Sequence, residues 1–109
     1  MAYDKELADR IRTLVADEPN LTEKAMFGGL AFLVGGNMAI AASGQGGILV
    51  RVDPAESAAL VADSPAEVAV MRGRPMAGWL RVGAADLDDS ELAAWARRGV
   101  AYARSLPAK

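Results

Sequence analysis

The sequence predicts an α+β fold: a two-layer structure in which an antiparallel sheet packs against helices at both ends of the chain. Apolar residues recur at helical spacing near both termini, and short runs of strand-forming residues fill the middle. Paired glycines separate these runs by connections that are too short to join parallel strands. The 109 residues suit a single domain, which we expect to span residues 1–109.

An amphipathic helix is expected over residues 4–16. Its apolar face consists of Leu7, Ala8, Ile11, Leu14 and Val15. Asp4 is a suitable N-cap, because its side chain can accept hydrogen bonds from the free amides of the first turn. Pro19 ends the helical region, since the residue before a proline avoids helical geometry.

Strands are expected at about residues 23–27, 30–34, 38–42, 48–52, 68–71 and 79–82. The first two runs could instead form one strand bent at Gly28-Gly29, which would leave a five-stranded sheet. Gly35-Gly36 fits a two-residue hairpin turn, and residues 43–47 fit a longer hairpin loop. Residues 72–78 are expected to link the last two strands as a turn.

Two further helices begin with capping sequences. Asp53 and Asp88 each precede a glutamate by three residues, which is the spacing of a capping box, and Pro54 suits the first helical position. The middle helix is short and ends at Ser64-Pro65. The last helix is expected over residues 89–104, with a buried stripe of Leu92, Trp95, Ala96, Gly99 and Ala103. Gly99 in this stripe predicts a close approach to a neighbouring element.

Both faces of the predicted sheet are apolar. Alternation along the strands places Leu30, Phe32, Val34, Met38, Ile40, Ala42, Ile48, Val50 and Val52 toward the core. The opposite face carries Ala31, Leu33, Ala39, Ala41, Leu49 and Arg51. An antiparallel sheet with one face in water would have a polar second face. We therefore expect a helix of this chain, or a second subunit in a two-fold homodimer, to cover it.

Composition argues against several classes of function. The chain has no histidine and no cysteine, which removes the usual general base, thiol chemistry and the commonest metal ligands. No phosphate-binding glycine motif is present. We expect no enzymatic activity, no catalytic residue, no cofactor and no metal site. The net charge of −2 argues against tight DNA binding. The absence of a signal peptide and of a membrane-spanning run predicts a cytoplasmic protein with no membrane contact.

The strongest candidate binding segment is residues 71–81, where arginines flank a glycine-proline turn and a tryptophan. Arginine and tryptophan are common in interface hot spots, so one interpretation is an anion- or partner-binding loop. The alternative is a solvated hairpin whose tryptophan fills the core. The candidate binding residues are Lys24, Arg51, Arg72, Arg74, Trp79 and Arg81.

Five short stretches resemble a known bacterial family. They read KAMFGGL at residues 24–30, GNM at 36–38, LVRV at 49–52, GRPMAGW at 73–79 and LAAWARRG at 92–99. In these stretches the chain resembles the N-terminal domain of the TfoX/Sxy family. The resemblance implies a fold of α-β-β-β-α-β-β-α order and gives no catalytic residues to carry over.

The best-known members of that family regulate natural competence, and they promote transcription together with the cyclic-AMP receptor protein. Those members also have a C-terminal domain, which we expect this chain to lack, because the sequence ends at Lys109. The leading hypothesis is a non-enzymatic regulatory module that binds a protein partner. The alternatives are a transcriptional regulator that contacts DNA directly through the candidate basic residues, and a small-ligand-binding protein.

Overall fold

The structure is a computed structural model that describes residues 3–26 and 28–108. Within them the chain forms three α-helices, two single-turn 3-10 helices (η) and six strands. The order is α1 (Lys5–Val15), β1 (Leu21–Met26), β2 (Gly29–Val34), β3 (Asn37–Ala42), β4 (Ile48–Arg51), η1 (Pro54–Glu56), α2 (Ser57–Asp63), β5 (Glu67–Met71), β6 (Arg74–Val82), η2 (Ala84–Asp86) and α3 (Asp89–Ser105). The predicted α+β class, the helices at both ends and the order of helices and strand groups are confirmed, with four strands before α2 where the family resemblance implied three.

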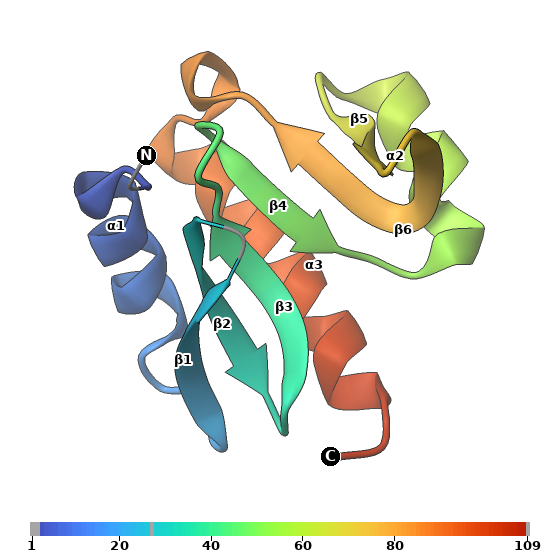
Figure 1. Cartoon of the computed structure of the whole chain (residues 1–109). Helices are drawn as coiled ribbons and strands as arrows, with labels where there is room; N and C mark the ends of the chain where they lie inside the picture. Colours follow the sequence, from blue (N-terminus) through green and yellow to red (C-terminus); the bar gives the residue numbers. More distant parts are fainter. Residues whose placement is uncertain (1–2, 27, 109) are drawn as a thin grey trace.

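The strands form one antiparallel sheet in the spatial order β1-β2-β3-β4-β6-β5. Helix α3 runs behind β3 and β4, and α1 lies beside it on the same side of the sheet (Figure 1). Helix α2 packs beside β6 and contributes Leu60 and Val61 to the edge of the same core. The main core therefore lies between one face of the sheet and the helices.

The first two predicted strands are separate strands of a hairpin, because Met26 pairs with Gly29 in antiparallel register. The alternative of one strand bent at Gly28-Gly29 is therefore wrong, and the sheet has six strands instead of five. Residue 27, the predicted end of the first strand, lies outside the described residues. The turn predicted at Gly35-Gly36 is confirmed, with φ of 60° and 83°.

The predicted turn over residues 72–78 is mostly strand. Only Arg72 and Gly73 form the turn, with φ of 53° and 75°, and β6 begins at Arg74. Arginine at positive φ is uncommon, and a proline normally argues against a central strand. Pro75 is tolerated because this part of β6 pairs only with β5, through Val70, and has no partner in β4.

Fewer residues of α1 are buried than the apolar pattern of its sequence predicts. Leu7, Ala8, Ile11 and Val15 are buried as expected. Leu14, expected on the same face, is 45 % exposed. It lies at the solvent margin of the stripe, so its assignment to the core was wrong.

A β-bulge reverses two predicted side-chain directions in β3. Phe32 pairs with Ile40 but Leu33 pairs with Met38, so Ala39 is the extra residue. Ala39 consequently packs in the main core, and Met38 packs on the opposite face. The sequence analysis placed Met38 in the core and Ala39 on the opposite face. That assignment was wrong because strict alternation along a strand does not allow for an inserted residue.

Helix α3 buries the whole predicted stripe, including Trp95, which has no exposed surface. A side-chain Cβ built on Gly99 would lie 2.3 Å from the backbone oxygen of Ala39. The predicted close approach at Gly99 is therefore confirmed. The bulged residue of β3 and the glycine of α3 therefore lie in close backbone contact.

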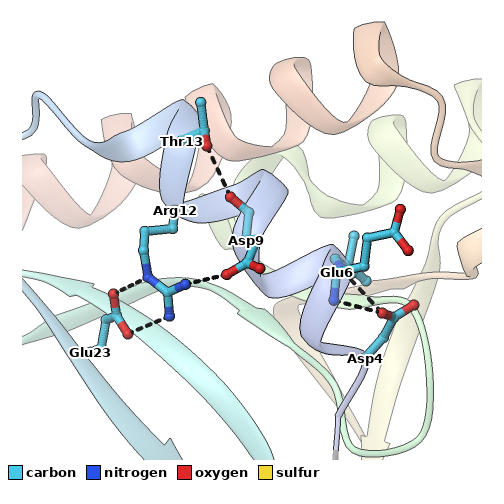
Figure 2. Close-up of polar contacts among 7 residues, drawn as sticks. Asp4, Glu6, Asp9, Arg12, Thr13 and Glu23 are labelled. Carbon is cyan, nitrogen blue, oxygen red and sulfur yellow. Dashed lines mark hydrogen bonds and ion pairs between the residues drawn. The ribbon is translucent and has the colours of Figure 1, made fainter.

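All three predicted helix caps are present. The Asp88 carboxylate accepts a hydrogen bond from the Glu91 amide at 2.8 Å, and Asp53 accepts one from the Ala55 amide at 2.9 Å. Asp4 accepts bonds from the amides of Glu6 and Leu7 (Figure 2). The element capped by Asp53 starts as the single-turn helix η1 before α2 begins.

We predict that Asp88→Ala lowers the free energy of unfolding by about 1 kcal/mol, because an amide of the first turn of α3 loses its acceptor. Asp88→Asn keeps a side-chain oxygen and should retain most of that stability. Urea denaturation of the three proteins measures the difference. An alanine variant as stable as wild type would show that the cap contributes nothing.

An ion pair joins α1 to the edge strand β1. Arg12 donates from Nε to Glu23 Oε2 at 2.7 Å and from Nη2 to Glu23 Oε1 at 2.9 Å, and it also contacts Asp9 (Figure 2). The hydrogen bonds from Arg12 lower the pKa of the Glu23 carboxyl below its ordinary value, against a smaller opposing effect of burial. The pair therefore favours the folded state when Glu23 is ionised.

This pKa shift predicts a pH-dependent stability. A lowered folded-state pKa contributes stability that is present above the ordinary glutamate value of 4.5 and is lost as the pH falls through the lowered value. Glu23→Gln should therefore melt slightly below wild type at neutral pH, with the difference disappearing in acid. Thermal melts of both proteins across this range provide the measurement. The pair is partly exposed, so the effect is small.

Candidate binding groove on the open face of the sheet

A second apolar cluster lies on the face of the sheet that points away from α1 and α3. Its buried members are Ala31, Ala41, Leu49 and Ala69, and its half-buried members are Met26, Leu33, Met38 and Trp79. All of them come from strands. The prediction that the second face is small and apolar is confirmed, except that Ala39 belongs to the core.

This face is hollowed into a groove of about 780 Å³. Ala31, Ala41 and Leu49 lie along its floor, and the methionines Met26 and Met38 flank them. Among the described residues, those that line the groove belong to strands, turns and loops, and none belongs to a helix. The helices of the described chain therefore leave this face open.

The strand register places one continuous row of side chains across the whole sheet. From β1 to β5 the paired residues are Lys24, Ala31, Ala41, Leu49, Arg81 and Glu67. Directly paired residues point to the same face of a sheet. The row is therefore apolar across the centre of the groove and charged at both margins.

Three arginines line the end of the groove formed by β5 and β6. Arg72 and Arg74 are exposed on the hairpin, whereas Arg81 is half-buried. Arg81 Nη1 donates to Ser43 Oγ at 3.2 Å, and the buried Ser43 hydroxyl also accepts a bond from the Gln45 amide at 3.1 Å. The β3–β4 loop thus holds the Arg81 guanidinium at the groove.

These arginines have no carboxylate partner within the described chain. None of the four ion pairs between described residues involves them. The described residues that line the groove include the three arginines and no aspartate or glutamate. The groove is therefore locally cationic on a protein whose net charge is −2.

Three of the six predicted binding residues line the groove, and the other three do not. Arg72, Arg74 and Arg81 line it, and Lys24 lies at the opposite margin of the same sheet face. The guanidinium of Arg51 lies over the rings of Trp79, at 5.0 Å, and Tyr102, at 5.6 Å, which makes it a packing residue. Trp79 is half-buried in the second cluster, so the expectation that it fills the main core is wrong.

The exposed apolar side chains of the groove were not predicted from the sequence. Val70 is 60 % exposed and Met76 is 37 % exposed, and both line the groove. Met76 was hidden in a stretch interpreted as a turn, and Met38 was assigned to the core. The shared signal is that Met26, Met38 and Met76 all lie on strands near glycines, a pattern too weak to interpret without the register.

No group of histidine, cysteine, aspartate or glutamate side chains suited to a metal ion occurs in the part of the chain that the structure describes. In that same part, no helix combines the length and apolar character needed to cross a membrane.

The fold and the groove define an α+β domain with an open groove, lined by three arginines, on one face of its sheet. Comparison with protein families matches residues 13–103 to the TfoX N-terminal domain. The chain belongs to this family, as its sequence stretches had indicated. Searches of curated proteins and of solved structures found no match.

Proposed function

We propose that this TfoX N-terminal domain is a non-enzymatic regulatory module that binds a partner protein through the groove. The observation that supports this most is an apolar groove, open and flanked by methionines and arginines, on a face that no described helix covers. Methionine and arginine are both enriched at protein interfaces, and methionine adapts its shape to different partners.

Exposed apolar side chains gather at this groove. Of the three large apolar residues with high exposure among those described, Val70 and Met76 line the groove, and only Leu14 lies elsewhere. Covering Val70 and Met76 would remove apolar surface from water, which favours association.

Family membership supports a regulatory role. We propose a cytoplasmic function in transcription control, similar to that of the competence regulators in which this domain occurs. The chain would act by holding a partner protein and not by chemistry of its own, in keeping with a sequence that lacks histidine and cysteine.

Affinity capture from the cells that produce this protein tests the proposal. Bait proteins are wild type, Val70→Glu, Met76→Glu and, as a matched exposed control, Leu14→Glu. Because all three substituted side chains are at least 37 % exposed, the variants should fold. We expect one or more proteins to be retained by wild type and Leu14→Glu and lost from both groove variants. Capture unaffected by the groove variants would contradict the proposal.

A small anionic ligand is the second candidate, because a volume of about 780 Å³ lies within the range of small-molecule sites.

Direct DNA binding has narrower support, since Lys24 and the three groove arginines share one face but the chain is acidic overall. A duplex titration is expected to show no submicromolar affinity at physiological salt. A homodimer through the same face also remains a proposal, which light scattering tests.

A further inference from the structure

We propose that the groove takes an amphipathic helix of the partner protein, with acidic residues beside its apolar stripe. This inference rests on the function proposed above and specifies the chemistry of the partner. It follows from three features of the groove: the position of its floor in the sheet, the size of the floor side chains and the sign of the charges at its margins.

Over the floor itself, the sheet offers no free strand edge with which an added strand could pair. Ala31, Ala41 and Leu49 lie on β2, β3 and β4, and each of these strands has a hydrogen-bonded neighbour on both sides. Their backbone groups are used within the sheet, so an extended segment lying over them would keep its own amides and carbonyls unpaired in an apolar groove. A helix bonds its own backbone internally, so it can enter the groove without that cost.

Two of the three floor residues, Ala31 and Ala41, have small side chains, which lets a helix come closer than larger residues would allow. The opposite face of the same sheet shows what this allows, since Gly99 of α3 approaches the backbone of Ala39 directly. On the open face Ala31 and Ala41 leave a shallow floor that neighbouring side chains cover, since their exposed fractions are 1 % and 7 %. The methionines beside it are flexible and can fill the space around an apolar stripe.

The charges at the margins select an acidic helix. Arg72, Arg74 and Arg81 lie at the β5–β6 end and Lys24 lies across the sheet on β1. Carboxylates next to an apolar stripe would meet guanidinium groups that have no ion-pair partner among the described residues. A basic helix would add like charges beside the same arginines. Glu67 at the outer end of the row is the one acidic member of that row.

Selection from a displayed peptide library tests this inference and does not require the partner to be identified first. The probe is a set of helical peptides about four turns long, with fixed apolar residues at i, i+3, i+4 and i+7 and random residues at all other positions. The library is selected on wild-type protein and depleted on Met76→Gln, which disturbs the groove without adding a charge. We expect enrichment of aspartate and glutamate at the random positions, and binding at least about tenfold tighter than that of the same peptide with lysine in their place.

Reversing the charge of two groove arginines tests directly whether they cause the preference for acidic peptides. A variant with Arg72→Glu and Arg74→Glu should reverse the preference from acidic to basic peptides, whereas Arg97→Glu on exposed α3 surface should not. Circular dichroism verifies the fold of each variant. Enrichment without acidic bias, no enrichment over the depleted pool, or a preference unchanged by the double reversal would each overturn the inference. A partner that depends on the groove in cell capture, combined with any of these results, would leave the proposed function standing and reject only the acidic helix.

Discussion

Replacing Trp95 by alanine is expected to lower the free energy of unfolding by about 3–5 kcal/mol, the usual cost of truncating a buried tryptophan. Trp95 has no exposed surface and is the largest fully buried side chain among the described residues. Domains of this kind have about 5–15 kcal/mol of stability in total. Trp95→Ala should therefore melt far below wild type or fail to accumulate in soluble form.

A second substitution, Trp95→Phe, distinguishes the effect of lost side-chain volume on stability from the effect of the buried indole N–H. The indole Nε1 of Trp95 is buried without a hydrogen-bond partner among the described residues. Trp95→Phe keeps much of the ring and removes that unpaired donor, so it should cost clearly less than Trp95→Ala. Thermal denaturation of the three proteins decides the matter. An alanine variant that melts within a degree or two of wild type would place Trp95 outside the core.

Gly99→Ala is expected to destabilise the domain by about 1–3 kcal/mol, the cost of inserting a methyl group into a closed contact. The new Cβ would lie 2.3 Å from the backbone oxygen of Ala39 and 3.0 Å from Val50 Cγ2, so helix and sheet must separate. In a free helix the same change would add up to about 1 kcal/mol of stability. The sign of the measured change in unfolding free energy therefore shows whether the steric clash or the gain in helix propensity is larger.

The matched control is Ala101→Gly, two residues along α3 at an exposed position. This change should cost about 1 kcal/mol through helix propensity alone. Urea denaturation of both variants gives the comparison. A Gly99→Ala variant more stable than wild type would show that α3 and β3 can move apart freely, contrary to the packing described here.

The parts of the fold that local chemistry controls could be predicted from the sequence. The aspartate caps of the helices depend on a few neighbouring residues, and the alternation of Ile48, Val50 and Val52 depends only on strand geometry. The stripe of α3, including the role of Gly99, followed from helical spacing. None of these predictions required the pairing register of the strands.

The features that could not be predicted depend on tertiary pairing. The bulge at Ala39 arises from the register between β2 and β3, and no local signal marks it. Arg72 takes a positive φ because the β5–β6 hairpin needs it, against the usual preference of arginine. Leu14 fits the apolar spacing of α1, but its side chain is exposed to solvent.

The candidate site was predicted in part, for the same reason. Arg72, Arg74 and Arg81 stand out in the sequence, and the structure brings them together. The floor and its methionines emerged only when the register showed which strand residues share a face. A charged residue can be identified from the sequence alone, whereas the residues that line a groove are known only once the strands are paired.

Photo-crosslinking in the producing cells tests the central claim, that a partner protein occupies the groove, most directly. A photoreactive amino acid is placed at position 76 in the groove or at position 14 on α1, both exposed apolar sites in the wild type. We expect a specific protein adduct from position 76 and none from position 14. Adducts from position 14 alone, or from neither position, would contradict it.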